Sequence, residues 1–600
     1  MNMTSGGEAR DLFRFGRFEL DVRSAELRKD GIRIRLQGQP FDVLVMLLQR
    51  PGEVLTREEL RRQLWPEGTF VDFEHGLNAA VKRLRAALGD NAERPRFVET
   101  LHRRGYRFIG PLESSLTPAP GDAVRAGSNG NHKRRLAVLP FATLSGSADH
   151  DYFTEGLREE MITQLGRLCA GRLGVIGRTS STLIQRTATR SRDVGQALRV
   201  DFVVEGNVRR DGDRVRITVQ LVETRGETQI WAESYDRHLA DCFQVQSDVA
   251  REIVQSVAVE LLPGTGAQPG ALTPEPLRTC SRNVSAQQAY LKGRYHWNRA
   301  LASALPQAIG FLEQAVSLDP KFACAHSGLG RAYVSAVNQY LLDSRSGLDR
   351  ARRAALTALE LDPTDAEAHL TLAEVNKILE HDWPGAEKAY RTALAFNASS
   401  EAIHRHYGQF LAARGRIQEA SAAADRACDL DPLCLVVNTS AAWVRYLARE
   451  YQEAIERCRH TLDMDEAFVP ARRLLAVALL HRGDREEATA ELEALAGDRP
   501  DPVTLAWIVH GFALKGDSTR AGTALQQLDK LAQAQTTSSY FKAMAHAAAG
   551  DSEDAITLLT RAVDECDPAV VNLGVDPRLD VLRCDSRYRE LVNRLALPHR

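Results

Sequence analysis

The C-terminal half of the chain repeats with a period of 34 residues, and this period restricts its fold more than any other feature. Intervals of 34 residues separate Asn397, Asp431, Asp465 and Arg499. Pairs ending in proline mark the same phase, or lie close to it, at residues 319–320, 362–363, 431–432 and 499–500. Because one such unit cannot bury its own apolar face, neighbouring units must stack. The period predicts an all-α array of about seven to nine helical pairs.

The residues inside one repeat identify its type. Small residues at Gly408, Ala420 and Ala427 fall where two paired helices approach, and Pro432 falls where the second helix must end. This pattern resembles the tetratricopeptide repeat, which we expect over residues 285–600. The resemblance implies a superhelix whose concave groove binds a protein or peptide partner. A rigid scaffold or a dimerisation surface, including a homodimer, is the alternative role of the array.

A second constraint lies near the N-terminus, in a helix predicted over residues 73–88. Its apolar residues recur at spacings of four, three and four, which places them on one stripe: Leu77, Val81, Leu84 and Leu88. Asn78, Lys82 and Arg85 have the same spacing on another face, with Arg83 beside them. In the major groove, Arg and Lys can pair with guanine and Asn with adenine. The pattern is typical of a DNA recognition helix, although charged faces are also common on ordinary surface helices.

The segment before this helix favours the recognition helix over the ordinary one. Thr56 and Glu59 form a T-x-x-E capping box, so a short helix begins there. We expect it to bury Leu60, Leu64 and Trp65, with Pro66 helping to stop it. Two helices in this order indicate a helix-turn-helix.

The segment after the helix predicts a wing. Residues 97–101 and 106–109 form two short strands. His102, Arg103 and Arg104 join them, followed by Gly105, a residue type that can adopt a positive φ. A basic hairpin beside a recognition helix is expected to lie along the DNA backbone or to enter the minor groove.

These segments resemble the OmpR/PhoB-type winged-helix effector domain over residues 12–112. The segments that carry the resemblance include Phe13–Gly16, Phe41–Leu44, Thr56–Leu60, Val81–Arg85 and Gly105–Phe108. The resemblance implies a four-stranded N-terminal sheet, three helices and a C-terminal hairpin. It also implies that DNA is contacted by Asn78, Lys82, Arg83, Arg85, Thr100 and Tyr106, with His102, Arg103 and Arg104 in the wing. The His-Arg-Arg turn departs from the family pattern. Only eleven residues precede the domain, so we expect no receiver domain and no control by aspartyl phosphate.

Between these regions the sequence predicts an α/β domain over residues 135–261. A buried-type strand at residues 136–141 precedes a helix at residues 155–168 and a further strand at residues 173–176. Two alternating runs then flank Asp211-Gly212, the strongest short signal of a β-hairpin. An amphipathic helix over residues 246–261 closes the domain. Residues rich in Gly and Pro predict flexible linkers at 113–134 and 262–284.

The middle domain resembles the TolB-like N-terminal α/β domain. Four segments carry the resemblance: Leu136–Phe141, Asp151–Leu157, Val204–Arg210 and Trp231–Asp236. Domains of this type have no defined catalytic motif, so the resemblance implies a coupling or ligand-sensing module. A purely structural spacer is an equal alternative.

Composition and missing motifs exclude other classes of protein. The formal net charge is −2, but residues 10–110 hold 20 Lys and Arg against 15 Asp and Glu, which supports attachment to nucleic acid. Nine cysteines without a C-x-x-C pair fit a reducing cytoplasm. No apolar run is long enough to span a membrane and the start lacks a signal peptide. No phosphate loop, zinc-protease, hydrolase or kinase motif occurs, so we expect no enzyme, cofactor or metal.

The sequence therefore predicts a multidomain, cytoplasmic regulator of transcription that binds double-stranded DNA. Its winged helix (α+β) would be controlled by the α/β domain and the all-α array. The competing hypothesis is a scaffold protein in signalling, in which the winged helix serves as a surface for protein contacts.

Overall fold

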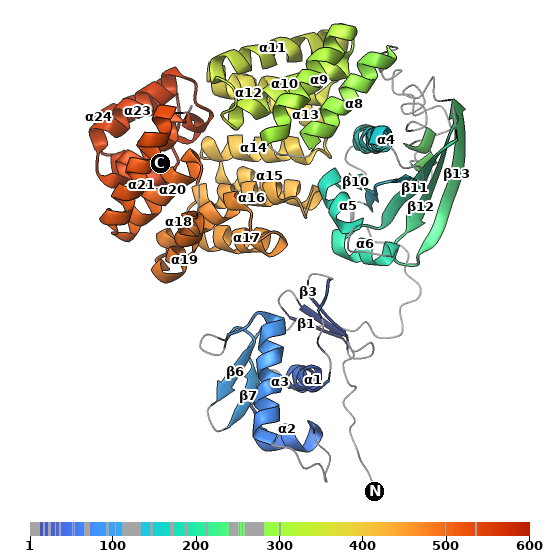
Figure 1. Cartoon of the computed structure of the whole chain (residues 1–600), viewed down its shortest axis with the longest axis vertical. Coiled ribbons are helices and arrows are strands. Elements are labelled where there is room, and N and C mark those ends of the chain that lie inside the picture. The colour runs from blue at the N-terminus through green and yellow to red at the C-terminus, as the bar shows by residue number, and fades with distance from the viewer. Residues whose placement is uncertain are drawn as a thin grey trace. The chain divides into compact units, whose positions relative to one another are not determined.

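The computed structural model contains two compact units, residues 1–131 and residues 132–600 (Figure 1). The described residues are 12–15, 18–21, 26–29, 32–34, 36, 38–50, 52, 54–64, 73–91, 95–101, 104–110, 134–143, 148–168, 173–185, 190–211, 214–238, 250, 252–254, 256–257, 281, 283–298, 302–497, 500–534 and 537–599. The predicted linkers, residues 113–134 and 262–284, lie almost entirely outside this set.

The first unit has the arrangement that the family resemblance implies. A four-stranded antiparallel sheet, β1-β2-β3-β4, precedes three helices, and a three-stranded antiparallel sheet, β5-β7-β6, ends with the hairpin. Its elements are β1 (Leu12–Phe15), β2 (Phe18–Asp21), β3 (Glu26–Lys29), β4 (Ile32–Ile34), α1 (Gln39–Gln49), β5 (Val54–Thr56), α2 (Arg57–Leu64), α3 (Phe73–Leu88), β6 (Val98–Leu101) and β7 (Gly105–Phe108). The pairing of β5 with the hairpin was not predicted from the sequence.

A helix cap and an aromatic cluster both stabilise this unit. The predicted capping box is confirmed, because Glu59 N donates to Thr56 Oγ1 at 3.2 Å and Thr56 N donates to Glu59 Oε2 at 2.8 Å. The hydrogen bond from the Thr56 hydroxyl lowers the pKa of Glu59. In the core, the Phe15 ring lies 5.1 Å from Phe108 and 5.7 Å from Phe97, which joins the two sheets through aromatic edges. Trp65 and Pro66, which the sequence placed at the end of α2, lie outside the described residues.

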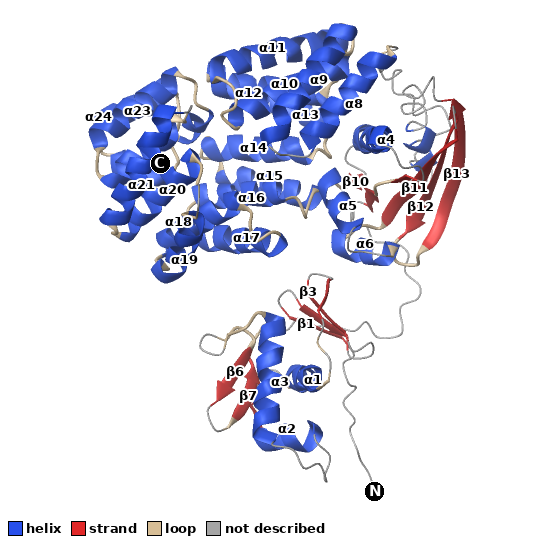
Figure 2. Cartoon of the chain, viewed as in Figure 1, coloured by secondary structure: helices blue, strands red, loops and turns tan. Residues whose placement is uncertain are grey.

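The second unit begins with a mixed sheet of order β10-β8-β11-β12-β13, and β9 pairs with β11 (Figure 2). Its elements are β8 (Arg134–Val138), β9 (Ala142–Thr143), α4 (Ala148–Leu168), β10 (Leu173–Val175), α5 (Arg178–Gln185), α6 (Ser191–Leu198), β11 (Phe202–Asp211), β12 (Arg214–Glu223) and β13 (Thr228–His238). Strands β10, β8 and β11 are parallel, and β11, β12 and β13 form an antiparallel meander. Asp211 pairs with Arg214, so the predicted hairpin is confirmed.

The sheet of this domain is covered by helices on both faces. Alternate residues of β8 separate onto two cores: Leu136 and Val138 pack with α4, whereas Ala137 packs with α5 and α6. This burial on both sides explains why the strand is a continuous apolar run in the sequence. Helices α5 and α6 and strand β13 were not predicted. Of the closing helix predicted over residues 246–261, residues 250, 252–254 and 256–257 are described, and they are helical.

Eight antiparallel helical pairs follow in the described residues, within the predicted seven to nine. Their helices are α8 (Val284–Asn298), α9 (Leu305–Leu318), α10 (Ala323–Asn338), α11 (Ser344–Leu361), α12 (Ala366–Val375), α13 (Trp383–Phe396), α14 (Glu401–Ala413), α15 (Ile417–Leu430), α16 (Leu435–Leu447), α17 (Tyr451–Met464), α18 (Val469–Arg482), α19 (Arg485–Leu495), α20 (Pro502–Lys515), α21 (Ser518–Ala534), α22 (Ser539–Ala549) and α23 (Ser552–Asp564). The helical turn η2 (Ala302–Ala304) precedes α9, and the π turn η3 (Asn376–Glu380) extends α12. The remaining elements are η4 (Pro568–Asn572), η5 (Pro577–Leu582) and α24 (Ser586–Arg594).

The repeat markers read from the sequence occupy equivalent positions. Asn397, Asp431 and Asp465 are the C-caps of α13, α15 and α17. At Gly408 a Cβ atom would lie 3.2 Å from the carbonyl oxygen of Ala420, so a small residue is needed where α14 meets α15. The 34-residue period therefore reports the end of the second helix in each pair.

The middle domain is docked on the array, and both belong to the second unit. At the start of α5, Gly177 N donates to Leu430 O at 2.6 Å and Ser180 N donates to Asp431 Oδ1 at 2.7 Å. A second contact joins α4 to α8, where Arg294 lies 3.3 Å from Glu159. The sequence predicts a flexible linker on each side of the middle domain; these contacts instead join the middle domain to the array as one body.

None of the described helices is both long enough and apolar enough to cross a membrane.

Candidate nucleic-acid interface

Helix α3 separates its residues onto two faces as predicted. The stripe of Leu77, Val81, Leu84 and Leu88 is buried in the core of the winged helix. Asn78, Lys82 and Arg83 are exposed on the other side. Burial of the stripe fixes the rotation of the helix, so the amide and the two cations must face solvent. A helix of this kind fits the major groove of double-stranded DNA.

Asn78 is held by two residues from other elements. Its Oδ1 accepts a hydrogen bond from the Tyr106 hydroxyl at 3.0 Å and one from Arg57 Nη2 at 3.4 Å. The Arg57 guanidinium also lies 5.5 Å from the centre of the Tyr106 ring. Because Oδ1 is already used, the free groups of Asn78 are its Nδ2 donors. Such a side chain is suited to an acceptor on a base edge or a phosphate, rather than to two-point pairing with adenine.

Arg85 points away from the exposed face and joins α3 to the hairpin. Its Nη2 donates to Val98 O and to Thr100 Oγ1, each at 2.7 Å. A charged donor shared between a carbonyl and a hydroxyl is a strong tether. The structure thus gives Arg85 a positioning role for the wing, and Thr100, which is exposed, lies at the same junction.

The tip of the hairpin is described in part. Arg104 is exposed, and Arg57 N donates to its carbonyl oxygen at 3.2 Å. At Gly105 a Cβ atom would overlap the carbonyl oxygen of Leu55, so glycine is required where β7 meets β5. Tyr106 is buried, and its hydroxyl donates a hydrogen bond to Asn78 Oδ1. His102 and Arg103 lie outside the described residues.

Sequence reasoning missed two residues of this interface. Arg57 begins α2 beside Asn78 and Tyr106, and its only sequence signal is a cation next to the capping box. Asp90 accepts hydrogen bonds from Arg96 N at 2.6 Å and Val98 N at 2.8 Å, which fixes the start of β6. Neither role follows from periodicity, because each depends on contacts between separate elements.

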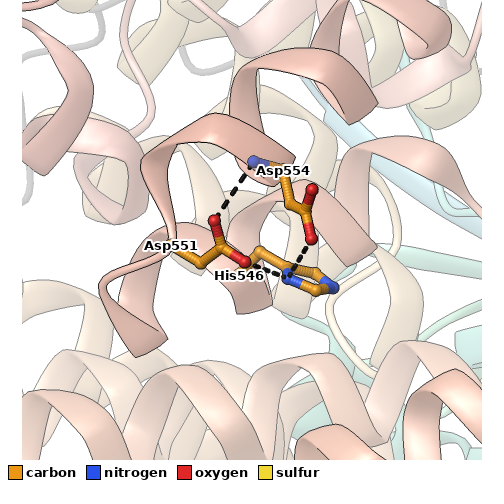
Figure 3. Close-up of side chains that lie close together, drawn as sticks. All are labelled: His546, Asp551 and Asp554. Atoms are coloured by element: carbon orange, nitrogen blue, oxygen red, sulfur yellow. Dashed lines mark hydrogen bonds and ion pairs between the residues drawn. The ribbon is translucent and has the colours of Figure 1, made fainter.

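One His and Asp cluster among the described residues has the spacing of metal ligands: His546, Asp551 and Asp554 (Figure 3). Asp551 is the N-cap of α23 and accepts a hydrogen bond from Asp554 N at 3.2 Å. His546 Nδ1 lies 3.4 Å from the other oxygen of Asp551. Asp517, which also follows a glycine, likewise accepts a hydrogen bond from Arg520 N at 3.1 Å at the start of α21. Asp551 thus belongs to the repeat turn, and we assign it a capping role; Asp554 supplies the backbone N–H that it caps.

The family comparisons divide the chain in the same way. Residues 31–108 match the family described as "Transcriptional regulatory protein, C terminal". Residues 132–253 match "HilA/YgeH-like transcriptional regulator, second domain". Residues 380–433 and 446–507 match tetratricopeptide repeats. The chain combines an OmpR/PhoB-type winged helix, a HilA/YgeH-like second domain and tetratricopeptide repeats. The TolB-like resemblance of the middle domain is not among these matches.

Three relatives illustrate the similarity. "Transcriptional regulator HilA" from Salmonella typhimurium is 23% identical over 75% of this chain and 77% of its own length. "Putative adenylate cyclase 3" from Rhizobium meliloti is 33% identical over 59% of this chain. The match spans only 55% of that relative, about half its length. "Cholera toxin homolog transcriptional activator" from Vibrio parahaemolyticus is 36% identical over 18% of this chain and 37% of its own length.

Proposed function

We propose that the chain is a sequence-specific regulator of transcription that binds double-stranded DNA through its winged helix. The observation that carries this proposal is the exposed face of α3, where Asn78, Lys82 and Arg83 project from a helix whose other side is buried. The similarity to a protein named as a transcriptional regulator across 75% of the chain supports it.

Within this proposal the predicted site residues have different roles. Lys82 and Arg83 contact base edges or phosphates, and Asn78 donates to an acceptor in the groove. Thr100, His102, Arg103 and Arg104 contact the DNA backbone from the wing. Arg85 positions the wing and Tyr106 positions Asn78. Arg57, which also supports Asn78, is proposed as an additional contact to DNA. We assign the winged helix to residues 12–112, the middle domain to residues 135–261 and the array to residues 285–600.

The rest of the chain provides control rather than chemistry. We infer that the middle domain, which we retain as TolB-like, and the array act together as one regulatory body, because they are docked through α5 and α4. This body receives a protein or peptide partner, or pairs two copies of the chain, and so changes DNA binding. We propose no enzymatic activity. We also propose a cytoplasmic location, because chromosomal DNA is found there and free thiols such as those of Cys458 and Cys566 stay reduced there.

The test uses the full-length protein and a pool of random duplexes. Selection followed by sequencing should recover a motif, and the affinity for it should fall with salt by about 0.9 log unit per phosphate contact per log unit of salt. A weak, salt-independent interaction with DNA, together with an intact protein complex, would favour the scaffold instead. Arg28→Ala is the matched control for Lys82→Ala, because Arg28 lies on β3 and pairs with Glu26 at 2.8 Å. It removes one cation from the winged helix without touching the exposed face of α3.

A further inference from the structure

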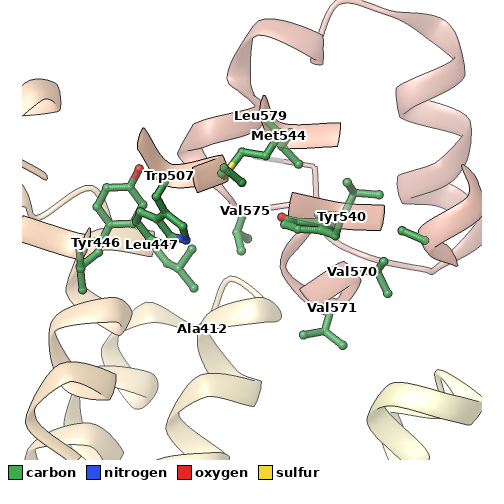
Figure 4. Packing of buried hydrophobic residues seen from close by; sticks show 14 of the residues in the cluster. Ala412, Tyr446, Leu447, Trp507, Tyr540, Met544, Val570, Val571, Val575 and Leu579 are labelled. Atoms are coloured by element: carbon green, nitrogen blue, oxygen red, sulfur yellow. The ribbon is translucent and has the colours of Figure 1, made fainter. Parts of the chain in front are cut away.

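The last residues of the chain fold back onto the array and occupy its inner face. We define residues 567–599 as the C-terminal segment; it contains η4, η5 and α24. Its apolar residues Val570, Val575 and Leu579 are completely buried. Figure 4 shows them among side chains of α16, α20 and α22. The segment is therefore packed inside the superhelix.

The polar contacts of the segment come from one face of the array. Tyr340, which follows α10, donates to Asp567 Oδ1 at 3.2 Å, and Arg414, which follows α14, donates to Ala596 O at 2.6 Å. Trp383 Nε1, which follows η3, donates to Leu595 O at 2.8 Å. Tyr340 and Arg414 stand just after the first helix of their pair, and Trp383 begins the second helix α13 directly after the turn that follows α12. The apolar contacts come from α16, α20 and α22, each the first helix of its pair, and stacked repeats create an extended concave surface.

The centre of this surface holds an arginine. The Arg578 guanidinium lies 4.2 Å from the ring centre of Trp507, 5.0 Å from that of Trp443 and 5.6 Å from that of Phe541. Its side chain is only 2% exposed, and its Nη1 has no hydrogen-bond partner. Three aromatic faces around a desolvated guanidinium form a strong cation–π site. The array thus supplies a cage for one arginine side chain.

Two carboxylates flank this arginine, and each has its own partner. Asp576 pairs with Arg578 at 2.6 Å and accepts a hydrogen bond from the Tyr540 hydroxyl at 2.8 Å. Burial alone would raise the pKa of Asp576, but the Arg578 charge overrides it and lowers that pKa. Asp580 makes a two-point pair with Arg449 at 2.6 and 2.8 Å. The array therefore recognises an Asp-Pro-Arg-Leu-Asp sequence at three points.

We propose that this concave surface is a docking site for a protein segment in which an arginine lies between two carboxylates, and that residues 576–580 occupy the site in cis. The external partner competes with the chain's own segment for the cage of Trp443, Trp507 and Phe541. A tethered segment has an effective concentration in the millimolar range, so a partner in trans binds only when the cis contact is weakened or the partner is tight. This inference deepens the regulatory part of the proposed function and rests on it only for the effect on DNA.

The experiment measures binding of a fluorescent peptide with the sequence of residues 573–583 to the full-length protein. Three variants weaken the cis contact in different ways. Asp580→Asn removes the carboxylate that pairs with Arg449 and leaves the array side of the site unchanged for the peptide. Arg578→Lys keeps the charge but loses the planar guanidinium. The double variant Asp576→Asn with Arg578→Met removes the buried pair without leaving one charge unpaired. Arg587→Ala is the control, because Arg587 pairs with Glu553 and Asp585 instead of with the inner helices.

We expect weak peptide binding to the wild type and to Arg587→Ala, and an affinity at least tenfold higher in the variants that loosen the segment. The same peptide with lysine in place of its arginine should bind at least tenfold more weakly. Hydrogen exchange provides a second measurement that needs no substitution: amides of residues 576–582 should exchange faster than those of α16 and α20. The proposal is overturned if no folded variant gains affinity, or if residues 576–582 exchange only when the whole array unfolds. No DNA is present, so failure here is distinct from failure of the proposed function.

Discussion

At the scale of single residues, Lys82 and Arg85 lie three positions apart on α3 but have different surroundings. Lys82 is exposed, whereas Arg85 donates to Val98 O and Thr100 Oγ1. We expect Lys82→Ala to weaken specific DNA binding by about 1 to 3 kcal/mol, the range for a base-reading contact, with no change in thermal midpoint. Arg85→Ala should lower DNA affinity and the thermal midpoint together. Titrations with specific and scrambled duplexes, combined with calorimetry, separate the two effects. Equal midpoints for both variants would contradict the positioning role of Arg85.

A second prediction at this scale concerns His510, which lies on α20 beside Arg578. Burial lowers the pKa of His510 to about 3, and the charge of Arg578 adds to the shift. Both ring nitrogens lack a hydrogen-bond partner, so the folded array holds the ring neutral. In the unfolded chain, His510 takes up a proton below the ordinary histidine pKa near 6.5. In the folded chain, it does not. The contribution of His510 to stability is therefore constant above pH 6.5 and falls as the pH drops from there toward 3.

The measurement compares thermal midpoints of the wild type and His510→Asn at pH 7.5 and pH 5.0. One excluded proton costs the wild type about 2 kcal/mol at the lower pH, from about 1.4 kcal/mol for each pH unit. The variant lacks this titration, so its midpoint should fall less between the two pH values. His599→Asn is a control, because His599 is exposed near the chain end. Equal pH dependence in wild type and His510→Asn would show that the His510 ring becomes protonated in the folded array.

At the scale of elements, the start of α5 joins the middle domain to the array. Ser180 Oγ accepts a hydrogen bond from Leu433 N at 2.8 Å, and Ser180 N donates to Asp431. Ser180→Ala leaves the partly buried Leu433 N–H without this acceptor, which should cost about 1 to 3 kcal/mol. Protease resistance of the second unit should decrease, whereas Ser191→Ala on α6, which is not in this contact, should leave it unchanged. Unchanged resistance of Ser180→Ala would mean that the docking contact adds no stability.

The same elements explain how far the sequence could predict the structure. Apolar spacing reports which side of a helix faces the core, so the bounds of α3 and the exposure of Lys82 were predicted correctly. The 34-residue period reports helix ends, so the array was predicted as well. Spacing contains no information on partners from distant elements. The tether from Arg85, the support of Asn78 by Arg57, and the contact between Tyr340 and Asp567 were therefore not predictable.

At the scale of the whole molecule, the docking of the middle domain on the array changes how regulation can work. Binding of a partner to the array can affect the middle domain directly, because both lie in one compact unit, residues 132–600. The winged helix has its own core, built on residues such as Phe15 and Leu84. Under the proposed function, control of DNA binding then acts between two separately folded units, through their accessibility to DNA or through pairing of two copies of the chain.

This division predicts two separate thermal transitions for the full-length protein. Thr56→Ala removes the capping box of α2, at a cost of about 1 kcal/mol, and should lower the winged-helix transition alone. For a domain of this size such a loss corresponds to a decrease of about 4 to 8 °C. Ser180→Ala should lower the other transition and leave the first unchanged. Differential scanning calorimetry of the two variants and their double mutant gives the comparison, and the two shifts should add because the sites share no contacts. A single transition that moves with either substitution would mean that the two units unfold as one cooperative body.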